Sequence, residues 1–294
     1  MLSGMARIAI VGGGSIGEAL LSGLLRAGRQ VKDLVVAEKY PARAKYLAET
    51  YSVLVTSVAE AVGHAQYVIV AVKPGDVESV VDEIVAGVTE AASDMAEQVF
   101  VTVAAGVPTQ FFENKLPAGA PVIRVMPNTP MLVGGGISAI AAGRFATEEQ
   151  MKEVASIFDA VGGVLTVPES QLDAVTAVSG SGPAYFFLMV EALVDAGVEA
   201  GLSRSVATEL VVQTMAGSAA MLLDRLDKAT AAAESGGRVV MDTSPAQLRA
   251  QVTSPGGTTA AGLRELERGG LRAAVAAAVE AAKTRSEQLR ITSE

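Results

Sequence analysis

A glycine-rich turn follows the first apolar stretch of the chain, and its spacing suits the binding of a phosphate-bearing ligand. It has the pattern G-x-G-x-x-G, between an apolar segment at 7–11 and an amphipathic segment that runs to Arg26. The pattern permits a tight turn, close approach of a pyrophosphate and packing of helix on strand. A turn without a ligand is the alternative. We predict dinucleotide contacts at Gly12, Gly13, Gly14, Ser15, Ile16 and Gly17.

An acidic residue stands where this kind of fold contacts the adenosine ribose. Glu38 ends the second apolar run, roughly 20 residues beyond the glycine turn, where a carboxylate accepts the ribose hydroxyls. Like charges about 4 Å apart at an effective dielectric of about 20 repel by roughly 4 kcal/mol, so Glu38 disfavours a 2′-phosphate and favours NADH over NADPH. Lys39 and Arg43 offset part of this repulsion, and a solvated turn acid is the alternative reading.

A second glycine turn, 254–259, lies far along the chain with the sequence Ser-Pro-Gly-Gly-Thr-Thr and precedes a predicted helix at 260–268. Backbone N–H groups and hydroxyls at a helix N-terminus form an anion site by the same physics as the first turn. No arginine fork stands nearby, so a small carboxylate suits this turn better than a polyphosphate. A plain helix cap is the alternative.

Composition excludes several classes of chemistry and of partner. The chain has no cysteine and a single histidine, His64, so disulfides, thiolate catalysis, a metal site and a histidine-based triad are not expected. A net charge of −9 argues against nucleic acid. The sequence shows no signal-peptide pattern, and no apolar run reaches the roughly 18 residues that a membrane span requires, so we expect a cytoplasmic protein with no membrane contact.

Strand and helix patterns alternate through the first half of the chain. Apolar runs at 34–37, 53–55, 67–72, 99–103 and 122–125 alternate with helical patterns at 41–49, 58–62 and 80–88. This predicts an α/β Rossmann-type domain with a doubly wound, mostly parallel sheet. Ligands of such sheets lie outside the carboxyl ends of the strands. The loops starting at Gly12, Lys73, Ala105 and Pro127 should meet there, although ordinary turns are the alternative for the last three.

Everything beyond a strand-like segment at 164–167 reads as helical, which predicts a dinucleotide-binding domain at 1–167 and an all-α domain at 168–294. The helix expected at 184–200 is apolar nearly all round and must be covered on every side. The second domain is too small to do so, which favours an interface between subunits. Further helices are expected at 204–223 and 273–288, with 227–238 the least ordered part.

Four separated motifs together resemble the pyrroline-5-carboxylate reductase family over essentially the whole length. They are the segments 71–74 (Ala-Val-Lys-Pro), 126–130 (Met-Pro-Asn-Thr-Pro), 179–185 (Ser-Gly-Ser-Gly-Pro-Ala-Tyr) and 254–259. The resemblance implies a reductase that uses NADH or NADPH to convert L-1-pyrroline-5-carboxylate to L-proline, the last step of proline biosynthesis. It also implies a homodimer through the C-terminal helices, often assembled into a decamer.

The resemblance assigns further residues to each ligand. Additional cofactor contacts fall on Ala71, Val72, Lys73, Pro74, Ala105, Gly106 and Asn128, the last near the nicotinamide. The substrate contacts fall on Asp242, Gln251, Ser254, Gly257, Thr258 and Thr259, with the substrate carboxylate on the backbone N–H groups of the last three. Two departures matter. The family often has small serine- or threonine-type residues where Glu38 stands, and the segment 227–241, which precedes Asp242, is longer than usual.

A protonated cyclic imine is already electrophilic, so the missing nucleophiles fit this chemistry. Hydride transfer then needs mainly proximity and orientation. Our hypothesis is that the Thr259 hydroxyl, the catalytic candidate, bonds the ring nitrogen; the proton comes from Thr259, from water or from the substrate itself. One rival is a related two-domain NAD(P)-dependent dehydrogenase of another small carboxylate, which usually needs a lysine or histidine base. Another is a non-catalytic dinucleotide sensor, in which the second glycine turn has no purpose.

Overall fold

The structure is a computed structural model that describes residues 7–90, 98–234 and 244–290, and the chain divides into two compact units. Unit 1 joins Met1–Pro183 with Val279–Glu294, and unit 2 is Ala184–Ala278. This division falls later than the domain boundary predicted between residues 167 and 168. The reason is that Leu172, beyond the predicted boundary, packs against Ala139 and Ala141 of the sheet.

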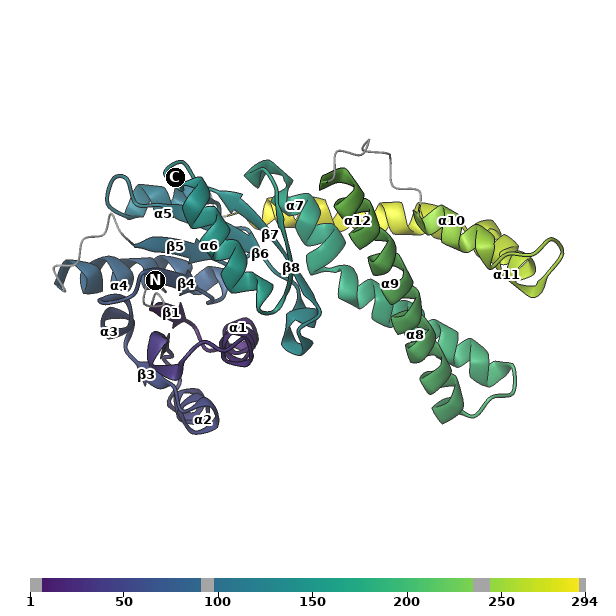
Figure 1. Cartoon of the computed structure of the whole chain (residues 1–294), viewed down its shortest axis with the longest axis horizontal. Helices are drawn as coiled ribbons and strands as arrows, with labels where there is room; N and C mark the ends of the chain where they lie inside the picture. Colours follow the sequence, from purple (N-terminus) through teal and green to yellow (C-terminus); the bar gives the residue numbers. More distant parts are fainter. Residues whose placement is uncertain (1–6, 91–97, 235–243, 291–294) are drawn as a thin grey trace. The chain divides into compact units, whose positions relative to one another are not determined.

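Unit 1 is built on an eight-stranded sheet with the strand order β3-β2-β1-β4-β5-β6-β7-β8 (Figure 1). All neighbouring strands pair in parallel except β6 and β7, which are antiparallel. The doubly wound, mostly parallel sheet predicted from the sequence is confirmed. The strands are β1 Ile8–Val11, β2 Leu34–Ala37, β3 Leu54–Thr56, β4 Tyr67–Val70, β5 Val99–Thr102, β6 Val122–Met126, β7 Gly136–Ala142 and β8 Gly162–Thr166.

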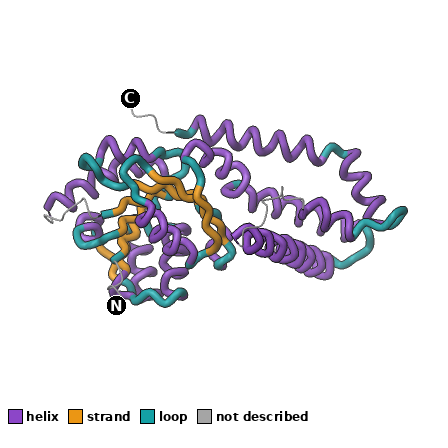
Figure 2. The backbone as a smooth tube through the Cα atoms, turned by 45° about the horizontal axis from the view of Figure 1, so that its top comes forward, coloured by secondary structure: helices purple, strands orange, loops and turns teal. Residues whose placement is uncertain are grey.

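Helices cover both faces of the sheet because alternate residues of each central strand point to opposite sides (Figure 2). Ile8 and Ile10 of β1 pack in one apolar cluster with α1, α2 and α6, and Ala9 and Val11 pack in another with α3, α4 and α5. These helices are α1 Ser15–Arg26, α2 Pro41–Tyr51, α3 Val58–Val62, α4 Val77–Glu90, α5 Thr109–Lys115 and α6 Glu148–Asp159.

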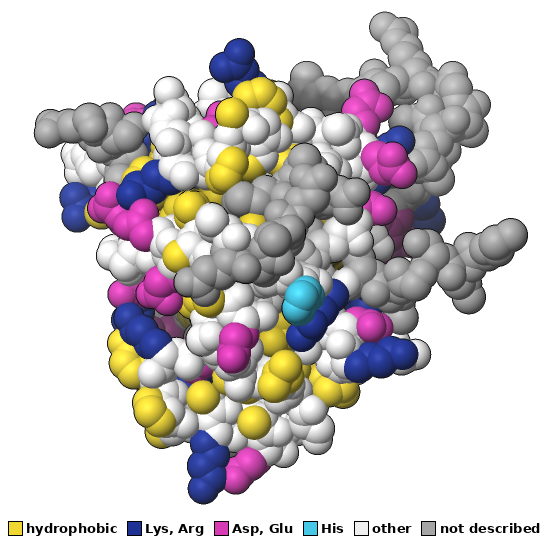
Figure 3. Space-filling view, turned by 90° about the vertical axis from the view of Figure 1, so that its left-hand side faces the viewer, with side chains coloured by type: hydrophobic (Ala, Val, Ile, Leu, Met, Phe, Trp, Pro, Cys, Tyr) yellow, Lys and Arg dark blue, Asp and Glu magenta, His cyan; other side chains and the backbone are white. Residues whose placement is uncertain are grey.

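The parallel pairing of β1, β4, β5 and β6 brings the loops that follow them to one edge of the sheet, as the sequence predicted. Helix α7 (Leu172–Val175), a π-helical turn at Thr176–Gly180 and the last residues of α12 (Leu271–Gln288) complete unit 1. His64 is exposed just after α3 (Figure 3).

Unit 2 is helical and contains α9 Arg204–Glu234, α10 Ser244–Gln251 and α11 Thr258–Arg268, with most of α8 (Gly182–Glu199) and the first part of α12. Gly201, at φ 101°, turns the chain from α8 into α9. The sequence prediction for α9 was wrong at its end, because the helix continues past Leu223 through most of the segment expected to be least ordered. Residues 224–234 are rich in alanine, and Lys228 pairs with Asp224 one turn away at 2.7 Å, both of which favour helix.

Among the described residues, two helical stretches are long and apolar enough, by length and composition, to cross a membrane: Glu169–Glu199 and Arg204–Ala229, each of which contains an 18-residue window with a mean hydropathy of 1.4. The sequence-based expectation that no stretch reaches that length was therefore wrong. It counted only uninterrupted apolar runs, and isolated charges such as Glu191 and Glu209 interrupt these helices. Their apolar side chains are largely exposed within one chain, among them Phe186, Phe187, Leu188, Leu193 and Leu210.

Candidate dinucleotide site

The glycine turn between β1 and α1 is shaped by close packing at its first and third glycines. Gly12 has a φ of 106°, and a Cβ there would lie 2.8 Å from the carbonyl oxygen of Ala71. A Cβ on Gly17 would lie 2.0 Å from the carbonyl oxygen of Gly12. A side chain on Gly12 would push the turn away from Ala71 at the end of β4, and a side chain on Gly17 would push α1 away from the turn. The two glycines therefore hold the shape of the loop.

The second glycine of the pattern is open instead of packed. Gly14 is the N-cap of α1, and a Cβ built on it meets no heavy atom within 4 Å. The first N–H groups of α1 lack carbonyl partners within the helix, and the helix dipole makes this end favourable for an anion. An open backbone beside unpaired N–H groups fits the pyrophosphate of a dinucleotide.

A cavity of about 570 Å³ lies in unit 1 along the carboxyl ends of β1, β2 and β4. Its volume is in the range of small-molecule sites. Six predicted cofactor residues line it: Gly12, Gly14, Glu38, Ala71, Val72 and Lys73. The sequence did not place Tyr40, Thr56, Ser57, Val58 and Asp76 in this cavity, although they line it too. A signal was present, because Thr56 ends β3 and therefore lies at the same edge of the parallel sheet.

The carboxylate of Glu38 is held at the cavity wall by backbone donors. The N–H of Gly13 donates to Oε2 of Glu38 at 2.9 Å, and the N–H of Tyr40 donates to Oε1 at 2.8 Å. A carboxylate accepts about four hydrogen bonds, so both oxygens keep capacity for further donors. The arrangement fits recognition of vicinal hydroxyls, which supply two such donors.

Both cations that follow Glu38 in the sequence are paired with carboxylates. Nζ of Lys39 lies 2.9 Å from Oδ1 of Asp76, and this hydrogen bond raises the pKa of the Lys39 ammonium. Arg43 donates from Nε to the carbonyl oxygen of Gly13 at 2.7 Å and from Nη2 to Glu18 in α1. The sequence placed these cations near Glu38 but gave no sign of their carboxylate partners, which lie 37 and 25 residues away.

Other predicted cofactor residues lie outside the cavity lining. Ser15, Ile16 and Gly17 belong to α1, and Pro74 begins a 3-10 turn at Pro74–Asp76. Ala105 and Gly106 follow β5, and a Cβ on Gly106 would lie 2.8 Å from the carbonyl oxygen of Leu289.

Asn128 ties together three segments near the end of β6. Its Nδ2 donates to Oγ of Ser179 at 3.2 Å, and its Oδ1 accepts from the N–H of Ile137 at 2.9 Å. Both ends of the side-chain amide are therefore engaged within unit 1. These hydrogen bonds give Asn128 a structural role, because they connect the loop after β6 to Ile137 and Ser179. The position of Asn128 near the nicotinamide stays a prediction.

The second glycine turn forms the N-terminus of α11 in unit 2, which begins at Thr258, two residues earlier than predicted. Gly256 has a φ of 69°. The N–H of Gly257 donates to the carbonyl oxygen of Ser254 at 3.1 Å, so this amide is already engaged. Thr258 and Thr259 are exposed in the first turn, where helix geometry supplies no carbonyl partner for the N–H. An anion held by this turn would therefore rest on those two amides.

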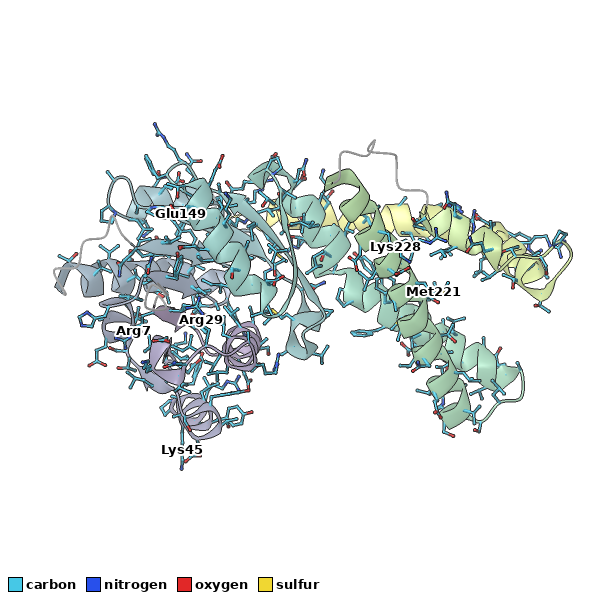
Figure 4. The ribbon with its side chains drawn as sticks, viewed as in Figure 1. Arg7, Arg29, Lys45, Glu149, Met221 and Lys228 are labelled. Atoms are coloured by element: carbon cyan, nitrogen blue, oxygen red, sulfur yellow. The ribbon has the colours of Figure 1, made fainter. Side chains whose placement is uncertain are left out.

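Two of the predicted substrate residues, Gln251 and Asp242, precede this turn in the sequence. Gln251, at the end of α10, lines a small cavity of about 260 Å³ within unit 2, together with residues of α9 that include Met221 and Lys228 (Figure 4). Asp242 lies outside the described residues. In the described ranges, no group of three or more histidine, cysteine or acidic residues could hold a metal ion.

Two family models match the chain. The model for pyrroline-5-carboxylate reductase dimerisation matches residues 169–289, and the model for NADP oxidoreductase, coenzyme F420-dependent, matches residues 7–106. The first covers the helical half, and the second covers the glycine turn, Glu38 and the first five strands.

Full-length relatives and solved structures agree with these models. Proteins named pyrroline-5-carboxylate reductase from Mycobacterium tuberculosis and Mycobacterium leprae are 69% and 70% identical over 297 residues, which is 100% of this chain and of each relative. The structure of a pyrroline-5-carboxylate reductase from Coxiella burnetii matches with a TM-score of 0.85 at 32% identity, covering 98% of this chain and 99% of that one. The pyrroline carboxylate reductase of Plasmodium falciparum, with NADP bound, matches with a TM-score of 0.78 at 29% identity, covering 97% and 98%.

Proposed function

The chain belongs to the pyrroline-5-carboxylate reductase family, and we propose that it reduces the C=N bond of L-1-pyrroline-5-carboxylate to give L-proline. The observation that carries the proposal is the glycine turn, where Gly14 is open beside the helix N-terminus and Glu38 stands further along the same cavity. In this role the protein is an NAD(P)H-dependent oxidoreductase of proline biosynthesis.

A reduced nicotinamide dinucleotide, when bound, supplies the hydride for this reaction. The chain's part is to hold it: the amides that follow Gly14 take the pyrophosphate, and Glu38 accepts from the ribose hydroxyls. We propose that NADH is preferred over NADPH. Glu38 repels a 2′-phosphate, and Lys39 and Arg43, which would attract one, are each paired with a carboxylate.

The substrate side of the proposal rests on the second glycine turn. The amides of Thr258 and Thr259 take the substrate carboxylate, and the Thr259 hydroxyl bonds the ring nitrogen and orients the imine. Ser254, Gln251 and Asp242 are proposed to shape the same turn. A protonated imine needs no covalent activation, so these residues need only hold the substrate in the orientation that hydride transfer requires.

We propose that the apolar faces of α8 and α9 are covered by a second copy of the chain and not by lipid. The dimerisation model covers both helices, and their exposed side chains line one groove that includes Phe186, Met189, Leu193 and Leu210. A cytoplasmic homodimer follows, and a decamer is its further assembly.

An absorbance assay at 340 nm tests the activity. Purified protein with NADH should oxidise it when pyrroline-5-carboxylate is added and should leave it unchanged when 2-oxoacids are added. Running the oxidation direction with 2-hydroxyacids and NAD⁺ provides the matched control. Turnover of hydroxyacids without turnover of pyrroline-5-carboxylate would identify the rival dehydrogenase instead. Comparison of NADH with NADPH tests the preference, and an NADPH preference of about tenfold would refute the charge argument around Glu38.

A further inference from the structure

Two side chains of opposite charge form hydrogen bonds with the backbone of Gly13 in the glycine turn. The N–H of Gly13 donates to Glu38, and the carbonyl oxygen of Gly13 accepts from Nε of Arg43 at 2.7 Å. Both side chains also line the cavity. Arg43 is closer to Glu38 in the sequence than any other arginine, and the carbonyl oxygen of Gly13 in the glycine turn accepts one of its hydrogen bonds.

A carboxylate on α1 holds a second donor of Arg43. Nη2 of Arg43 donates to Oε2 of Glu18, whose other oxygen accepts from the hydroxyls of Tyr51 at 2.8 Å and Tyr46 at 3.1 Å. Burial acts to raise the pKa of the Glu18 carboxyl, but these hydrogen bonds, with Arg43 first among them, outweigh burial and hold the pKa below its ordinary value. Glu18 is thus charged at neutral pH, and both of its carboxylate oxygens accept hydrogen bonds.

We propose that Glu18 is a specificity-determining residue for the cofactor, acting through Arg43. By fixing and neutralising the guanidinium on the glycine turn, Glu18 withholds it from a 2′-phosphate on the adenosine ribose. The proposal deepens the proposed function, since it rests on this cavity binding the adenosine end of a dinucleotide.

The geometry favours Arg43 over Lys39 as the cation that determines the preference between the two cofactors. The Lys39–Asp76 pair is the more exposed, with side-chain exposures of 61% and 39%, against 31% and 19% for Arg43 and Glu18. Exposed pairs are weak, whereas a guanidinium released from its carboxylate can bind phosphate with two parallel hydrogen bonds.

Binding of the oxidised cofactors tests the proposal without turnover, because NAD⁺ and NADP⁺ differ only in the 2′-phosphate. Titration calorimetry gives the ratio of their dissociation constants for the wild type, which by itself tests the proposed NADH preference. In Glu18→Gln the side chain keeps its shape and loses its charge. We expect the ratio to move toward NADP⁺ by at least about fivefold, a typical effect of one close charge pair.

Two further variants isolate the cause. Glu49→Gln removes one negative charge from α2, where Glu49 pairs with Lys45 on the exposed surface, and should leave the ratio within about twofold of the wild type. Glu18→Gln combined with Arg43→Met should lose the gain in NADP⁺ affinity. An unchanged ratio in a folded Glu18→Gln variant overturns the proposal, and so does a gain that survives the loss of Arg43. Neither result depends on which cofactor the wild type prefers.

Discussion

Arg290 donates two hydrogen bonds to the carboxylate of Asp173, a residue 117 positions earlier in the chain. The side chain of Asp173 is 2% exposed and also accepts from Oγ of Ser286 at 2.7 Å. These contacts fasten the end of α12 to α7 within unit 1. The carbonyl oxygen of Leu289, in the same fastened segment, occupies the space that a side chain on Gly106 would need. The segment at 286–290 therefore supports the loop that follows β5.

Removal of the Arg290 guanidinium should destabilise the protein. Arg290→Met leaves a buried carboxylate with one partner fewer, and we expect a loss of about 2 kcal/mol in the free energy of unfolding. Urea denaturation measures it. The matched control is Arg268→Met, since Arg268 pairs with Glu265 on the surface and its loss should cost less than about 0.5 kcal/mol. Equal effects of the two substitutions would contradict a special role for the Asp173 contact.

The same contact predicts a dependence of stability on acid pH. Burial acts to raise the pKa of Asp173, but hydrogen bonds from Ser286 and Arg290 and the charge of Arg290 outweigh burial and hold the pKa below the ordinary 3.8. A carboxyl with a lowered pKa contributes stability above the unfolded pKa and loses it as the pH falls through the folded pKa. The advantage of the wild type over Asp173→Asn should be constant above about pH 5 and should shrink below about pH 4. A difference that does not change with pH would show that the charge of Asp173 plays no part.

Gly14 and Gly17 should respond in opposite ways to alanine. Gly14 has open space and a φ of −66°, so Gly14→Ala should cost less than about 1 kcal/mol of stability. Its methyl group stands where the pyrophosphate approaches, and the dissociation constant for NAD⁺ should rise at least about tenfold. Gly17→Ala, whose Cβ meets the Gly12 carbonyl, should lower the melting temperature instead. Calorimetry and thermal melts separate these outcomes, and normal NAD⁺ binding by Gly14→Ala would remove the glycine turn from the site.

Local patterns in the sequence predicted the sheet and one wall of the cavity. The glycine turn and Glu38 are short-range signals, since a turn and a strand end each depend on a few neighbouring residues. Strand β7 was missed because its sequence, Gly-Ile-Ser-Ala-Ile-Ala-Ala, has few residues typical of strands. Helix α6 was missed although Thr147 and Gln150 form a capping box that the sequence displays.

The contacts that the sequence did not predict, in the site and outside it, are long-range. Arg43 meets Gly13 across 30 residues, and Arg290 meets Asp173 across 117. The sequence does not show which partner a charged side chain pairs with, because several oppositely charged residues are always available. Only the packing of α2 against the glycine turn selects Glu18 for Arg43. The fold was therefore predictable in outline, and the pairing of its charges was not.

The assembly should depend on the exposed apolar face of α8. Phe187 is 64% exposed within one chain, and Phe187→Glu would place a charge inside the proposed interface between copies. We expect sedimentation of the variant at 30.0 kDa, the mass of one chain, and of the wild type at a multiple of it without detergent. Leu54→Glu, on the exposed strand β3, is the control and should leave the assembly intact. A wild type that sediments as a single chain would refute the interface.

Thr259 gives the sharpest test of the proposed chemistry. Thr259→Val keeps the shape of the side chain and removes the hydroxyl, so kcat/KM for pyrroline-5-carboxylate should fall by about a hundredfold or more. The dissociation constant for NADH should stay unchanged, because the second glycine turn belongs to the substrate side of the proposal. Thr259→Ser keeps the hydroxyl and should recover most of the activity, which a purely structural role would not require. An unchanged kcat/KM in Thr259→Val would remove Thr259 from the mechanism and leave the backbone amides of the turn as its remaining contribution.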